Sequence, residues 1–114
     1  MANPIRGEKE ITLNGVKYAT KLNLNSMMVM ERKLERSTIK VLGQISQGDL
    51  PLQDMVTILQ IALKGGNNDL SDADVKKLVW EHGVIASIGV VGEVLANALA
   101  GEEEDEGKPE AVNE

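Results

Sequence analysis

The chain has 114 residues, enough for one small domain with one hydrophobic core. It contains no cysteine, which excludes disulfides, cysteine-based zinc sites and thiol nucleophiles and fits a reducing compartment. Phenylalanine is absent, and one Trp and one Tyr cannot form the aromatic platforms on which single-stranded nucleic acid stacks.

The formal net charge of −6 is concentrated at the C-terminus. Residues 102–114 contain seven acidic side chains and one lysine, whereas residues 1–101 contain eleven basic and eleven acidic side chains. A formally neutral body has no basic footprint for nucleic acid. The like-charge run predicts a disordered acidic tail over residues 101–114, which serves solubility or, alternatively, acts as a detachable arm or a join to an extension.

Residues 8–24 predict a β-hairpin. Two alternating runs are joined by Asn14-Gly15, the preferred pair for a type I′ turn, because both central residues need a positive φ. This turn pairs Leu13 with Val16. The apolar face, which we expect to pack on helices, then carries Ile11, Leu13, Val16, Tyr18, Thr20, Leu22 and Leu24.

Helices are expected after the hairpin. Asn25 or Ser26 can cap a first helix over SMMVMERKLER. Ser37 or Thr38 can cap a short second helix, whose apolar stripe is Ile39, Leu42 and Ile45, spaced by three. Gly48 ends this helix, because glycine accepts the left-handed conformation that follows a helix.

Three further helices complete the chain. Pro51 suits the first turn of LPLQDMVTILQIALKGG. Ser71 with Asp74 three residues later resembles a capping box for a helix that Gly83 interrupts. The apolar run GVIASIGVVGEVLANALA then extends to Ala100. Its Val and Ile content allows a strand in the first half, but its length favours a helix.

The predicted fold class is α+β. One domain over residues 1–100 packs the hairpin 8–24 against four or five helices within residues 26–100. No membrane span is predicted, because the last apolar run is at the lower limit of length and contains Glu93 and Asn97, which are costly in lipid. No signal peptide is predicted at the N-terminus.

No catalytic, cofactor or metal site is predicted. His82 is the only histidine, and we interpret it as a hydrogen-bonded residue at a helix end. The spacing of Asn67, Asp69 and Ser71 resembles a calcium loop. That loop would need glycine at its sixth position and glutamate at its twelfth, and neither is present.

Two apolar groups are candidate partner-binding residues. Methionine side chains are flexible and fit varied apolar helices, although plain core packing explains them as well. Small and aliphatic residues of the last helix allow either intramolecular packing or association with another helix. Trp80 can anchor an interface or cover part of the core. The candidates are Met27, Met28 and Met30 on the first helix, and Val84, Ile88, Val91, Leu95 and Leu99 on the last.

The order of these segments resembles a known family. NPIRGE leading into EITLNGVKY, and then a capped helix ending in MERKLER, is similar to the start of tail proteins of gene transfer agents and long-tailed phages. LPLQDMVTILQIALKGG, LSDADVKKLVWEHG and an apolar last helix follow the same layout, so that the resemblance covers about residues 3–100. Such proteins are described as tail assembly chaperones and sometimes as tail tube proteins.

The resemblance implies a non-enzymatic protein that binds the tape measure protein during tail morphogenesis in the cytoplasm of a bacterial host. It allows the tail tube protein and a second copy of the chain as further partners. Two alternatives stay open. A structural tube component would need large β-sheets, whereas the sequence predicts one hairpin. A small protein-binding regulator is the other alternative, and the lack of a basic recognition helix argues against DNA binding by it.

Overall fold

The computed structural model describes residues 7–100, so the predicted acidic tail lies outside the described residues. In chain order the elements are β1 (Glu8–Leu13), β2 (Val16–Lys21), α1 (Leu24–Leu34), α2 (Thr38–Ser46), α3 (Leu52–Gly65), α4 (Asp72–His82) and α5 (Val84–Ala100). The predicted α+β fold class is confirmed, and the last apolar run is helical throughout.

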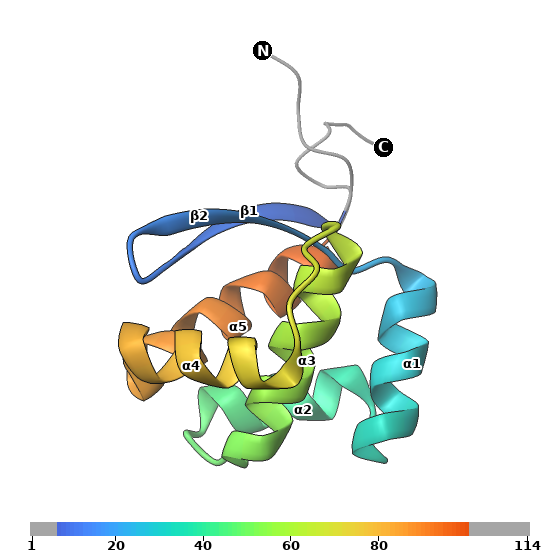
Figure 1. Cartoon of the computed structure of the whole chain (residues 1–114). Coiled ribbons are helices and arrows are strands. Elements are labelled where there is room, and N and C mark those ends of the chain that lie inside the picture. The colour runs from blue at the N-terminus through green and yellow to red at the C-terminus, as the bar shows by residue number, and fades with distance from the viewer. Residues whose placement is uncertain (1–6, 101–114) are drawn as a thin grey trace.

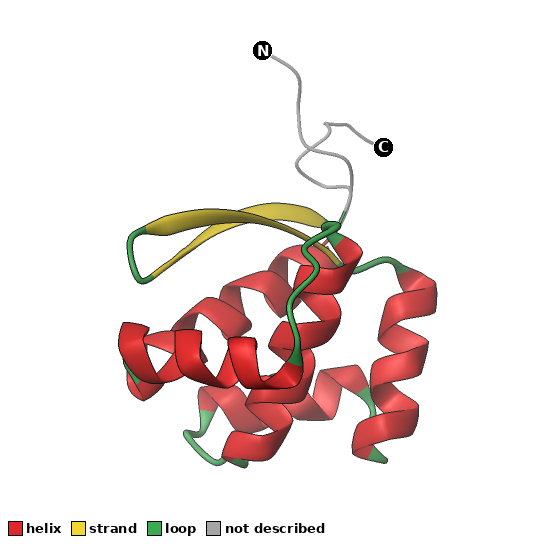
Figure 2. Ribbon diagram, in the orientation of Figure 1, coloured by secondary structure: helices red, strands yellow, loops and turns green. Residues whose placement is uncertain are grey.

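The two-stranded sheet covers one side of the helices (Figure 2). β2 packs on α3, whereas β1 packs on α5 and α4 (Figure 1). α3 also contacts α1, α4 and α5, so it lies at the centre of the fold. Its apolar stripe accordingly contributes six buried side chains to the core, namely Met55, Val56, Ile58, Leu59, Ala62 and Leu63.

The hairpin has the predicted turn and register. Asn14 and Gly15 have φ angles of 52° and 81°, and Leu13 pairs with Val16. Leu13 is fully buried, but Val16 is 50% exposed. The expectation that the whole apolar face is covered is therefore wrong at Val16. This residue lies beside the turn, where the hairpin is held to α4 by a hydrogen bond from the Asn14 amide to His82 Nδ1 (2.9 Å).

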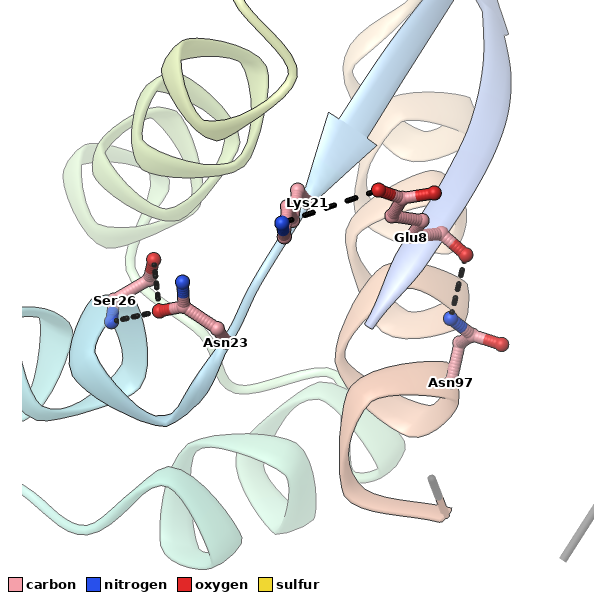
Figure 3. Close-up of polar contacts among 5 residues, drawn as sticks. All are labelled: Glu8, Lys21, Asn23, Ser26 and Asn97. Carbon is pink, nitrogen blue, oxygen red and sulfur yellow. Dashed lines mark hydrogen bonds and ion pairs between the residues drawn. The ribbon is translucent and has the colours of Figure 1, made fainter. Parts of the chain in front are cut away.

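The other end of the hairpin is joined to α5 by a polar contact, and the cap of α1 lies just past β2 (Figure 3). Asn97 of α5 donates a hydrogen bond to the backbone carbonyl of Glu8 (3.1 Å). Lys21 forms a cross-strand ion pair with the Glu8 carboxylate (3.9 Å). Two residues past β2, the Asn23 side chain accepts a hydrogen bond from the Ser26 amide (2.8 Å) and thereby caps α1.

This cap corrects the predicted start of α1. The helix begins at Leu24, two residues before the predicted start, because Asn23 provides the capping oxygen in place of Asn25 or Ser26. Leu24 therefore leaves the hairpin and stands in the first helical turn. Its side chain is 72% exposed instead of packed under the sheet. The helix also ends earlier than predicted, at Leu34.

The other helix boundaries follow local signals. Ser37 caps α2, and its side chain accepts a hydrogen bond from the Lys40 amide (3.1 Å). The capping box at the start of α4 is present, since Ser71 and Asp74 each accept a hydrogen bond from the other's amide. Pro51 occupies the cap position of α3 instead of its first turn.

The end of α3 closes the edge of β2. A Cβ atom on Gly66 would lie 2.0 Å from the carbonyl oxygen of Ala19, and one on Gly65 would lie 2.2 Å from that of Lys21. Asn68 donates a side-chain hydrogen bond to the same Ala19 carbonyl (2.6 Å). Close backbone approach thus requires glycine at both positions, although the φ of −87° at Gly66 is open to any residue. The contact protects this sheet edge from pairing with another chain.

We expect Gly66→Ala to destabilise the protein by about 1–3 kcal/mol, because the new methyl group must displace the backbone of β2. Gly89→Ala is the matched control. A Cβ atom there meets nothing within 4 Å, and alanine in a helix interior is favoured by about 1 kcal/mol. Urea denaturation measures both changes. Equal midpoints for Gly66→Ala and the parent would contradict the close approach.

Candidate partner-binding groove

An exposed apolar groove lies where α1, α2 and the end of α5 meet. One part is a hollow of about 160 Å³ with side chains from all three helices. A neighbouring hollow of about 270 Å³ shares Leu24 and Met27 with the first and extends to Ala98. We call this surface the α1–α5 groove and define it by Leu24, Met27, Met28, Ile39 and Leu99.

The apolar walls of the groove are open to solvent, and two of them stand in the first turns of helices. Leu24 follows the Asn23 cap of α1, and Ile39 is the second residue of α2. Leu24 is 72% exposed, Ile39 is 73% exposed and Met28 is 49% exposed. Adjoining apolar side chains that remain in water are typical of protein-binding surfaces. Methionine also adapts its shape to different apolar partners.

Glu31 holds the two sides of the groove together. Its carboxylate accepts a hydrogen bond from the Thr38 amide at the start of α2 (2.7 Å). This hydrogen bond from the Thr38 backbone lowers the pKa of the Glu31 carboxyl below its ordinary value of 4.5. A negative charge at a helix N-terminus is also favoured by the helix dipole. Glu31 therefore positions Ile39 relative to Met28.

We expect the free energy of unfolding of Glu31→Gln to fall less steeply with decreasing pH than that of the parent. Because folding lowers the pKa of Glu31, the carboxylate stabilises the protein above pH 4.5, and this contribution is lost as the pH falls through the lower folded-state pKa. The parent should thus lose more stability than the variant below pH 4.5. Urea midpoints over a pH series measure the difference, with Glu35→Gln as the control on the same helix. Parallel curves for parent and Glu31→Gln would contradict this role.

The structure brings only part of the predicted partner-binding set to this groove. Met27, Met28 and Leu99 line it. Val84 and Ile88 are partly buried against the core and lie outside the lining. The remaining three candidates are packed in the core with 0% exposure and are unavailable to a partner, namely Met30, Val91 and Leu95.

Sequence reasoning missed Leu24 and Ile39. Leu24 was expected under the hairpin, and Ile39 on the apolar stripe of the second helix. In the structure Val41 is the fully buried residue of that helix, while Ile39 points to solvent. Leu24 directly follows the Asn23 cap, but Ile39 is the second residue after the Ser37 cap and the residue between them, Thr38, is buried, so no single local signal marks both exposed positions.

A second exposed apolar pair flanks the bend at Gly83. Trp80 near the end of α4 is 78% exposed, and Ile85 near the start of α5 is 81% exposed. Trp80 therefore does not cover the core, and the interpretation as an interface anchor remains. His82 has the helix-end role that was predicted, since its Nδ1 accepts the hydrogen bond from the turn of the hairpin.

Within residues 7–100, no three histidine or acidic side chains lie close enough together to hold a metal ion. No single helix in that range is both long and apolar enough to cross a membrane. Only α4 and α5 taken together, across a bend of 113°, reach the required length and composition.

The fold and the groove define a small α+β protein whose exposed apolar surface suits protein binding. The sequence profile of the family described as "Phage tail tube protein, GTA-gp10" matches residues 6–101, and the chain belongs to this family of phage tail proteins. The match includes the hairpin and all five helices. No curated protein and no solved structure matches the chain significantly.

Proposed function

We propose that this protein is a tail assembly chaperone that binds the tape measure protein through the α1–α5 groove. The observation that carries the proposal is the open apolar groove on a phage tail family member. A tape measure protein is a very long, largely helical chain with apolar faces that need cover before the tube surrounds them. An amphipathic helix laid in an apolar groove is a common mode of peptide recognition.

The chemistry of the groove suits a partner that is recognised by shape and apolarity. Leu24, Met28 and Ile39 offer aliphatic and thioether contacts, and among residues 7–100 Glu31 is the only charged side chain that lines the groove. The acidic residues 102–114 would keep chaperone–tape measure complexes dispersed through their net charge of −6. Binding would take place in the host cytoplasm while tails assemble.

A structural tail tube component is the second candidate, because the family description names a tail tube protein. Exposed Trp80 and Ile85 offer a surface for contacts between subunits. The chaperone is favoured over this candidate by the sheet content. Residues 7–100 contain one sheet of two strands, whereas a hollow tube would need large sheets from every subunit.

Co-expression with the tape measure protein of the same tail module tests the proposal. We expect the tape measure protein to become soluble and to elute with this protein in size-exclusion chromatography. Mass spectrometry of purified tails separates the two candidates, since a chaperone leaves before completion and a tube subunit stays in many copies. An insoluble tape measure protein without a complex, or stoichiometric amounts of this chain in finished tails, would reject the chaperone.

A further inference from the structure

A groove between α1 and α3 carries positive charge. Its volume is about 420 Å³, and within residues 7–100 its only charged lining residues are Lys33 of α1 and Lys64 of α3. Ser26, Thr57 and Gln60 supply hydrogen-bonding groups between them. We call it the lysine groove. It shares no lining residue with the α1–α5 groove and lies on a different face of α1.

Both lysines are open to an anionic ligand. Their side chains are exposed and stand in the last turns of α1 and α3. The ion pairs formed within residues 7–100 lie elsewhere and are Lys21–Glu8, Arg36–Asp54 and Lys76–Asp72. By contrast, the hollow beside β2 has two acidic and two basic lining residues, so its charges balance. Of these four hollows, the lysine groove is therefore the one with a net positive lining.

We propose that the acidic run of residues 102–106, Glu-Glu-Glu-Asp-Glu, binds in the lysine groove of the same molecule. The run has five negative charges in five residues, which complement the two lysines. An extended carboxylate-rich segment can bind both ammonium groups and accept hydrogen bonds from the neighbouring hydroxyl and amide side chains. The contact needs no regular structure in the tail, so it agrees with the composition of this segment.

The described chain ends near the start of the groove. Leu99 lines the same hollow as Leu24 and Met27, and Ala98 lines the neighbouring hollow with Asn23, so α5 ends near the start of α1. The lysine groove begins at Asn25 and extends along α1 to Lys33, a distance of about 12 Å at the rise of an α-helix. Residues 101–106 span about 20 Å when extended. Residues 101–106 therefore exceed the length of the groove by about 8 Å, which is the length left for the path from Ala100 to Asn25.

Paramagnetic relaxation enhancement in the full-length chain tests the proposal. The absence of cysteine allows one nitroxide label at Val112→Cys. At about 0.01 M salt, where the Debye length is about 30 Å, we expect selective broadening of the Ser26, Lys33 and Thr57 amide signals. At about 1 M salt, where the Debye length is about 3 Å, the broadening should disappear.

The double variant Lys33→Gln/Lys64→Gln should abolish the broadening at low salt. The matched control Lys40→Gln/Lys77→Gln, which neutralises two exposed lysines outside the groove, should retain it. Unchanged amide spectra elsewhere verify that both variants are folded. Broadening spread evenly over the surface, broadening that survives the groove substitutions, or none at low salt would overturn the proposal. Broadening transferred from labelled to unlabelled copies in a mixed sample would also overturn it, because the tail would then bind a second molecule.

Discussion

Met28→Glu and Ile39→Glu should each weaken the complex with the tape measure protein by about 2 kcal/mol or more, which is roughly thirtyfold in Kd. Both side chains line the α1–α5 groove. A carboxylate there would have to lose its hydration against an apolar partner without gaining an ion pair. Folding should be nearly unaffected, because Met28 is 49% exposed and Ile39 is 73% exposed.

Leu52→Glu is the matched control for the groove. Leu52 is a 55% exposed leucine at the start of α3 and does not line the groove, so the same charge should leave the complex intact. Val91→Glu should instead prevent folding, because Val91 is fully buried and its replacement places a carboxylate in the core. Complex stability is measured by isothermal titration with a soluble tape measure segment, and folding by circular dichroism. Equal weakening by Leu52→Glu and Met28→Glu would show that the groove is not the binding surface.

Leu13→Asp should destabilise the fold by at least about 3 kcal/mol. Leu13 is 0% exposed and lies on the covered face of β1, so the substitution removes a packed side chain and buries an unpaired carboxyl group. Domains of this size have total stabilities of about 5–15 kcal/mol. The variant should therefore melt well below the parent or fail to fold.

Val16→Asp is the control for Leu13→Asp at the directly paired position of β2. Val16 shares the face and the turn with Leu13 but is 50% exposed, so its carboxylate can stay hydrated and the cost should be within about 1 kcal/mol. Thermal and urea denaturation of both variants measure the difference. A Leu13→Asp protein that melts within a degree or two of the parent would contradict the register of the hairpin.

Local patterns in the sequence determined much of the fold. Asn14-Gly15 specified the turn and, with it, the register, because few residue pairs accept two positive φ angles. The caps at Ser37 and Ser71 were equally clear, since a side-chain oxygen satisfies amides only two or three residues away. The order of these segments also pointed to the tail protein family to which the chain belongs.

Only the tertiary structure decided which apolar side chains are left in water. Met28 and Met30 are close neighbours on one helix, yet one lines the α1–α5 groove and the other is in the core. The groove itself combines α1 and α2 with the end of α5, which lies far from them in the chain. Hydrogen bonds that set turns and caps act over a few residues, and the sequence records them directly. Burial depends on where distant helices cross, so apolar periodicity predicts a packed face without determining which residues at its margin remain exposed for a partner.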